Sequence, residues 1–117
     1  MLAVLVCFTI PHRGEAEGPS PSRGKETFEK RCGGCHSPDR DKEGPRLRGV
    51  YGRQAGSVSS FSYSTALKSA HINWDAESLD KWLTDPEKVV PDTDMAFHVD
   101  KAEERRDIIA YLKDLSK

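Results

Sequence analysis

Two cysteines and a histidine form the densest group of reactive side chains in this 117-residue chain. Cys32 and Cys35 are separated by two glycines, and His36 follows directly. This C-x-x-C-H spacing is typical of covalent haem attachment, because both thiols can reach the vinyl groups along one porphyrin edge while the adjacent imidazole lies under the iron. The motif predicts one haem c, bound through Cys32 and Cys35, with His36 as the first iron ligand.

A zinc half-site, a thioredoxin-like redox pair and a chance match are the alternative interpretations. Zinc would need two more soft ligands at zinc-finger spacing, but no third cysteine lies in the domain and His71 and His98 stand alone. A redox pair belongs in a βαβ pattern, which does not surround the motif. Haem attachment is therefore the favoured interpretation.

Met95 is the candidate for the second iron ligand. A thioether sulfur stabilises reduced iron, and Met95 is the only methionine besides Met1. Pro91 keeps the preceding segment out of a helix. The alternative is a core methionine that fills a gap, but the surrounding residues have little helical or strand periodicity to support that role.

Other residues are suited to support a haem. Metal-bound histidine usually donates its second ring N–H to an acceptor, for which the Pro45 carbonyl is a candidate. Arg53, Tyr63 and Trp74 carry cationic or polar groups that could hold the propionates, which would otherwise be unpaired charges. Taken alone, each of these residues would be an ordinary surface or core residue.

The elements that position these groups are predicted to be helices. Ser22 could cap a first helix that carries both cysteines on one face, and the glycines of the motif should loosen its end. A short helix is predicted over residues 64–70. A further helix is predicted from a cap at Asp75 to about residue 84, before Pro86, which cannot continue it. The last helix is predicted to follow a capping box formed by Asp100 and Glu103. With no β-alternation and no repeat, the sequence predicts a small all-α domain with long loops.

Composition limits the function. The formal net charge of −1 and the lack of an aromatic-interleaved basic stripe exclude nucleic acid as a partner. Residues 1–10 form an apolar run too short to span a bilayer but similar to the centre of a secretory signal, and residues 18–22 form a linker. We expect residues 1–22 to be a leader and linker, and residues 23–117 to be the domain.

Several segments in the same order resemble the class I cytochrome c family, from about Arg23 to Leu115. They are Cys32-Gly33-Gly34-Cys35-His36, Gly44-Pro45-Arg46-Leu47-Arg48-Gly49-Val50-Tyr51-Gly52-Arg53, Phe61-Ser62-Tyr63-Ser64, Trp74, Val90-Pro91-Asp92-Thr93-Asp94-Met95-Ala96-Phe97 and Asp107-Ile108-Ile109-Ala110-Tyr111-Leu112-Lys113. The resemblance implies four or five short helices around one covalent haem, with the first and last helices crossing.

The resemblance also implies roles for individual residues. His36 and Met95 are its axial ligands, and the Pro45 carbonyl lies behind His36. The residues near the propionates are Arg53, Tyr63, Ser64 and Trp74. At the helix crossing, Gly24 and Phe28 are implied to meet Ile108 and Tyr111.

Three features depart from the family. In mitochondrial-type members lysines surround the haem edge, whereas here Asp92 and Asp94 precede Met95, which makes half of the docking surface acidic. A basic half could be supplied by Arg31, Arg46 and Arg48. Trp82 replaces the usual tyrosine, so a hydroxyl-to-sulfur hydrogen bond is expected to be absent. His98 is a conceivable replacement ligand.

The predicted function is one-electron transfer by a monomeric carrier that is not an enzyme. A membrane oxidase, reductase or dehydrogenase would be its redox partner, with at most peripheral membrane contact and a periplasmic or otherwise exported location. A haem enzyme or gas sensor that loses Met95 and a fixed subunit of a larger complex are the alternatives.

Overall fold

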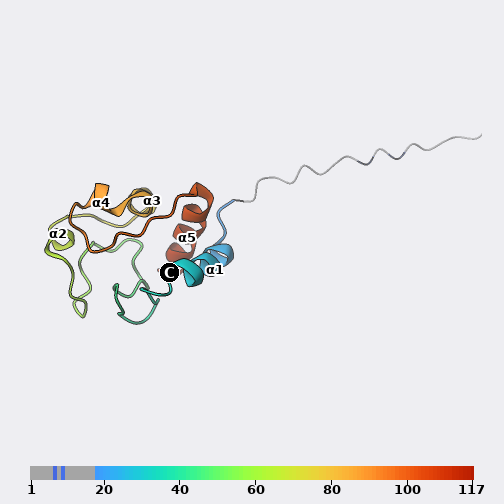
Figure 1. The fold of residues 1–117 in the computed structure, drawn as a ribbon. Coiled ribbons are helices and arrows are strands. Elements are labelled where there is room, and N and C mark those ends of the chain that lie inside the picture. Colours follow the sequence, from blue (N-terminus) through green and yellow to red (C-terminus); the bar gives the residue numbers. More distant parts are fainter. Residues whose placement is uncertain (1–6, 8, 10–17) are drawn as a thin grey trace, which may run out of the picture.

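Helices are the regular structure of the chain, for which a computed structural model describes Cys7, Thr9 and residues 18–117. No strand occurs among these residues, and an isolated β-bridge joins Gln54 to Asn73. A long loop separates the first two helices (Figure 1). The all-α prediction is confirmed. The helices are α1 Pro21–Arg31, α2 Thr65–Lys68, α3 Ala76–Thr84, α4 Pro86–Val89 and α5 Ala102–Asp114.

The cap of helix α1 lies two residues earlier than the cap predicted at Ser22. Ser20 is the N-cap, and its hydroxyl oxygen accepts a hydrogen bond from the Arg23 N–H at 3.2 Å. Pro21 suits the first helical position because its missing N–H would have no helical partner there. At the other end the helix stops before the motif, and the His36 N–H donates to the Cys32 carbonyl at 2.8 Å in the following turn.

Helices α1 and α5 cross in close contact, as predicted. A Cβ atom at Gly24 would collide with the Asp107 carbonyl oxygen and would lie 2.9 Å from the Tyr111 Cβ. Further along, the rings of Phe28 and Tyr111 pack edge to face with centroids 5.4 Å apart. Only glycine allows the two backbones to approach this closely at the crossing.

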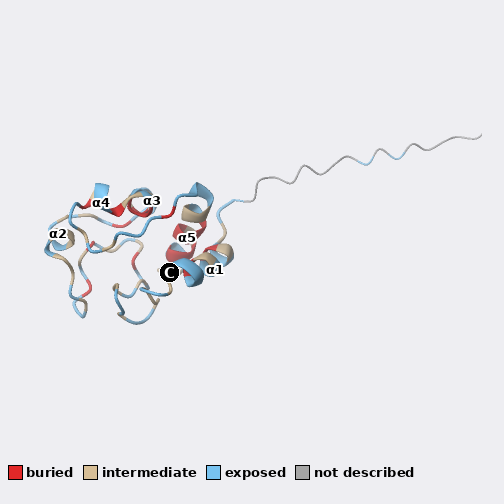
Figure 2. Ribbon diagram, in the orientation of Figure 1, coloured by how far each residue is buried: buried red, intermediate tan, exposed pale blue. Residues whose placement is uncertain are grey.

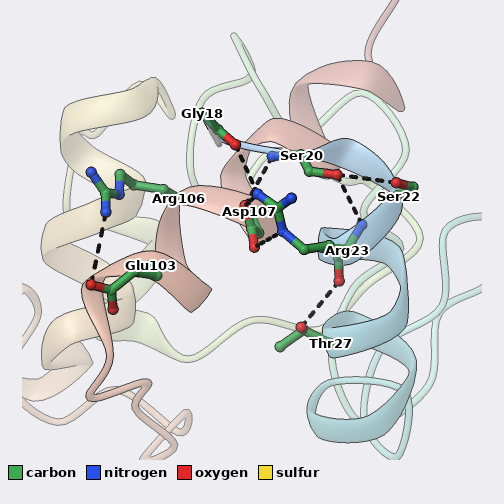
Figure 3. A network of polar contacts seen from close by, with 8 residues as sticks. All are labelled: Gly18, Ser20, Ser22, Arg23, Thr27, Glu103, Arg106 and Asp107. Carbon is green, nitrogen blue, oxygen red and sulfur yellow. Dashed lines mark hydrogen bonds and ion pairs between the residues drawn. The ribbon is translucent and has the colours of Figure 1, made fainter. Parts of the chain in front are cut away.

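The buried Asp107 carboxylate of α5 binds the start of α1 through hydrogen bonds and an ion pair (Figure 3). Asp107 accepts from the Arg23 Nε at 3.0 Å and from the Ser20 N–H at 2.9 Å. Burial raises the pKa of Asp107, but these two donors outweigh burial and hold that pKa below its usual value. The ion pair therefore stabilises the crossing at neutral pH.

Helices α3 and α4 follow one another at Pro86. Asp75 and Ser78 form the capping box of α3, which ends at Thr84 as predicted. Pro86 ends α3 and also begins α4, because proline is tolerated in a first turn. Its buried residues, Leu79, Trp82 and Leu83, face the core.

The predicted capping box of α5 is wrong. Lys101 is the N-cap, and no side-chain cap hydrogen bond is formed. The Asp100 carboxylate instead lies 3.3 Å from the His98 Nε2, while its carbonyl accepts from the Arg105 Nη1 at 2.8 Å. The spacing of Asp100 and Glu103 does not show that His98 and Arg105 would contact the carboxylate and the carbonyl of Asp100 instead.

The core joins the inner faces of α1, α3 and α5 to the loops (Figure 2). Ile108 and Val99 are among its most deeply buried residues. Between residues 18 and 117 no helix is long and apolar enough to cross a membrane. The predicted leader falls mostly on residues 1–6, 8 and 10–17, which lie outside the described residues, whereas the last two residues of the predicted linker, Pro21 and Ser22, belong to α1.

Candidate functional site

A central cavity of about 400 Å³ lies between the long loop, α3, the segment around Met95 and α5. Its volume falls in the range of small-molecule and cofactor sites. The structure brings every predicted site residue to its wall, from segments spread over more than half of the chain. These residues are Cys32, Cys35, His36, Pro45, Arg53, Tyr63, Ser64, Trp74 and Met95.

The two cysteines reach the cavity from the turn after α1. Cys32 is half-buried, and burial raises the pKa of its thiol to about 11. Cys35 is exposed, and its thiol donates to the Glu43 Oε2 at 3.3 Å, a hydrogen bond that raises its pKa. Dithiol redox chemistry uses a thiolate, which these environments disfavour.

His36 is held in one orientation by its neighbours. Its Nδ1 lies 2.9 Å from the Pro45 carbonyl oxygen, which leaves the other ring nitrogen available to a metal. A Cβ at Gly44 would collide with the ring, so glycine is required beside it. Burial lowers the pKa of His36 and favours the neutral imidazole, which is the form that binds iron.

Met95 meets an unexpected hydrogen-bond donor. The Trp82 indole N–H donates to the Met95 sulfur, with nitrogen and sulfur 3.2 Å apart. The tyrosine hydroxyl is absent, as the sequence showed, and the indole N–H is the polar partner of the sulfur in its place. An indole N–H is a donor only, so it can supply the contact that a hydroxyl would otherwise make.

The four residues predicted to lie near the propionates have partners within the protein. Arg53 donates to the Arg46 carbonyl at 3.0 Å. The Tyr63 hydroxyl accepts from the Val58 N–H at 3.1 Å, and the Ser64 hydroxyl caps α2. The fourth, Trp74, packs edge to face against Trp82 with centroids 5.3 Å apart.

Three of the cavity residues that were not predicted for the site contact residues that were. Glu43 lies against the Cys35 thiol, and Gly44 against the His36 ring. Phe61 also lines the wall and packs on Tyr63, with ring centroids 4.9 Å apart. Glu43 and Gly44 directly precede Pro45 in the sequence, and this adjacency to a predicted site residue could have indicated that they belong to the site.

The cavity fits a haem. Its wall is mainly apolar, as a porphyrin requires, and it carries two thiols, one neutral imidazole and one thioether. No group of three histidine, cysteine or carboxylate side chains placed to hold a bare metal ion occurs in the part of the chain that the structure describes. The donor set matches a covalently bound haem.

Fold and site together define a small helical haem protein of the c type. The family model "Cytochrome c" matches residues 21–116, and the chain belongs to the cytochrome c family. Cytochrome c of Euglena viridis is 50% identical over 105 residues, which cover 87% of this chain and 98% of that protein. Cytochrome c of Gibberella zeae is 42% identical over 104 residues, covering 86% and 98%.

A solved structure has the same fold. Cytochrome cH from Methylobacterium extorquens matches with a TM-score of 0.77 and 38% identity, over 81% of this chain and 98% of that one. Proteins of this family carry one covalent haem c and transfer electrons without being enzymes. The chain is therefore a haem electron carrier that works with redox partners.

Proposed function

We propose that the protein shuttles single electrons through a haem attached to Cys32 and Cys35, with His36 and Met95 as axial ligands. The observation that carries this proposal is that all four side chains line the same cavity. They come from two segments about sixty residues apart in the sequence, and the fold brings them together. When bound, the haem supplies a one-electron couple between ferric and ferrous iron.

The protein would keep both axial ligands in place during the redox cycle. The Pro45 carbonyl fixes the His36 ring, and the Trp82 N–H contacts the Met95 sulfur. Fixed ligands mean that little has to move when the charge on the iron changes. Because no substrate is transformed, no acid, base or nucleophile is required.

The propionates would be held by Arg53, Tyr63, Ser64 and Trp74. All four line the cavity, so a bound haem could meet one cation and three hydrogen-bonding groups. Among residues 18–117, the Trp74 indole N–H has no hydrogen-bond partner, which leaves it available to a carboxylate.

Loss of Met95 to create an open sixth site is less well supported. The Trp82 contact helps to hold the sulfur in place. His98 does not line the cavity and its ring is paired with Asp100, so the haem-enzyme alternative gains no distal base from it. An electron carrier that keeps both ligands remains the better proposal.

We further propose that residues 1–22 contain a leader and linker whose apolar run directs export, and that the domain spans residues 23–117 together with the start of α1 at residues 20–22, which packs against it. The apolar run at residues 1–10 supports a periplasmic or otherwise exported location. There, a monomeric carrier would connect a membrane oxidase, reductase or dehydrogenase to its electron source.

Substitution of the predicted ligands tests the proposal. Met95→Ala should abolish the weak far-red sulfur-to-iron band of the ferric protein and lower the midpoint potential, because a water or an empty site replaces the thioether. Replacing Cys32 and Cys35 together with alanine should make the haem extractable by acidified organic solvent. An unchanged far-red band in Met95→Ala would exclude Met95 as the ligand.

A further inference from the structure

The exposed rim of the central cavity combines an aromatic ring with charged side chains. We call this rim the cavity mouth, and it consists of the exposed residues that line the cavity. These are Arg31, Cys35, Glu43, Ser62, Asp94, Ala96 and Phe97.

Phe97 gives the mouth an apolar centre. Its side chain is 41% exposed, and it is the exposed large hydrophobic residue of the described part of the chain. The Arg31 guanidinium lies over the ring, 5.3 Å from its centroid. An exposed aromatic ring at the entrance of a cofactor cavity is the kind of residue that anchors a protein contact.

The one cation of the mouth, Arg31, already has a carboxylate partner. Arg31 forms an ion pair with Glu104 at 2.5 Å, which neutralises its charge. Lys42, which precedes Glu43, donates to the Gly33 carbonyl at 2.7 Å. Of the two, Lys42 alone has no carboxylate facing it at salt-bridge distance among the described residues.

The carboxylates at the mouth lack cationic partners. Glu43 contacts the Cys35 thiol, which would no longer donate to it after haem attachment, because the thiol hydrogen would move to a vinyl carbon as the thioether forms. Asp94 forms no hydrogen bond or ion pair with any described residue, and neither does Asp92, which is also exposed. Within the mouth, Glu43 and Asp94 face no cation, and the charge of Arg31 is neutralised by Glu104, so the mouth carries a net negative charge.

We propose that the cavity mouth is the docking surface for a redox protein whose own face carries lysine or arginine side chains around an apolar patch. The cations of the partner would meet Glu43, Asp92 and Asp94, and its apolar patch would cover Phe97. Complementary charge steers association and raises the on-rate, while the aromatic ring contributes contact area once water is excluded. This proposal rests on the proposed function, because it requires the haem to lie in the cavity.

Small redox reagents of opposite charge test the charge of the mouth before a partner is known. Electron exchange with cationic hexaammineruthenium and anionic ferricyanide should be measured as a function of ionic strength in the wild type and in Asp94→Arg, Glu43→Arg and Glu26→Arg. Arginine is chosen because its guanidinium stays protonated and is a poor iron ligand. Glu26 is exposed on α1, does not line the cavity and gives the same change in net charge.

We expect the wild-type rate with the cationic reagent to fall as salt rises. At low ionic strength, Asp94→Arg and Glu43→Arg should each slow that reagent roughly fivefold and accelerate ferricyanide, whereas Glu26→Arg should change either rate by less than about twofold. Midpoint potentials measured in parallel correct for driving force. Equal effects of the three variants, with a normal haem spectrum, would overturn the docking surface.

A partner-like face gives the second test. Beads coated with a copolymer of lysine and phenylalanine present both cations and apolar rings. Binding to them should be stronger for the wild type than for Asp94→Arg, and Phe97→Ser should weaken the salt-resistant part of the binding. No difference between Phe97→Ser and the wild type would remove Phe97 from the surface. A haem spectrum without low-spin bands would instead contradict the proposed function itself.

Discussion

The crossing of α1 and α5 and the segment around Met95 hold the haem site from two sides by different means. The crossing is closed by backbone contact at Gly24 and by the buried pair of Arg23 and Asp107. Residues 91–101 have no helix or strand, and most of them are exposed. The cysteine and histidine side of the site is thus fixed by packing, whereas the methionine side depends on a few local contacts.

This difference predicts which property of the protein each region controls. A change at the crossing should affect the folding of the whole domain, because α1 and α5 form its largest helix contact. A change near Met95 should affect the haem ligand and its potential with little effect on global stability. Four substitutions, ordered by the size of the expected effect, test this distinction.

Gly24→Ala should have the largest effect. The new Cβ would collide with the Asp107 carbonyl, so the helices must separate, at a cost of about 3 kcal/mol or more in the free energy of unfolding. Denaturant unfolding followed by circular dichroism measures the loss. Gly18→Ala is the matched control, because no atom lies within 4 Å of the added Cβ. Equal stability of the two variants would contradict the close crossing.

Asp107→Asn should destabilise the crossing by about 2 kcal/mol at neutral pH, since a buried carboxylate with an arginine partner is lost. The folded pKa of Asp107 is depressed, so its contribution is complete above its unfolded pKa of about 3.9 and is lost as pH falls through its folded value. The wild type should therefore lose stability in acid more steeply than the variant.

Urea midpoints measured between neutral pH and about pH 3 would show this difference in slope. Asp114→Asn is the control on the same helix, because Asp114 is exposed and pairs with Lys117 at the surface. If both variants showed the same acid profile as the wild type, the ion pair of Arg23 and Asp107 would not stabilise the crossing.

Trp82→Phe should act on the ligand more than on the fold. Removing the N–H returns electron density to the Met95 sulfur and favours ferric iron, so the midpoint potential should fall by roughly 40 mV, equivalent to about 1 kcal/mol. Voltammetry measures the shift. Trp82→Tyr retains a donor and should shift the potential less. A larger fall in Trp82→Tyr than in Trp82→Phe would argue against the hydrogen bond.

Asp92→Gly should have the smallest effect. Asp92 has a positive φ of 65°, which a glycine adopts without strain, so the segment before Met95 should be stabilised by about 0.5–1 kcal/mol. The pH at which the far-red band disappears should rise. His71→Gly removes similar strain at a φ of 52° outside this segment, and it should leave the band unchanged.

The sequence predicted the parts of the site that depend on short-range spacing. The C-x-x-C-H motif, the Asp75 cap of α3 and the glycine at the crossing each follow from local rules or from the family pattern. The cap of α1 was misplaced because Pro21 suits the first helical position, which makes Ser20 the cap, and the cap of α5 was misplaced because His98 competes for the Asp100 carboxylate. Such competition is decided by geometry that spacing does not contain.

Contacts between distant segments were beyond sequence reasoning. Trp82 and Met95 are thirteen residues apart, and nothing in their spacing shows that the indole N–H points at the sulfur. The neutralisation of Arg31 by Glu104, which makes the mouth acidic, joins residues seventy-three positions apart. Both contacts arise from the tertiary fold.

The optical spectrum of the wild-type protein, produced with a c-type haem maturation system, tests the central claim most directly. We predict sharp bands in the dithionite-reduced form, a weak far-red band in the ferric form and no ready binding of carbon monoxide, because His36 and Met95 fill both axial sites. High-spin bands or rapid carbon monoxide binding would show an open sixth site and would contradict the proposed carrier.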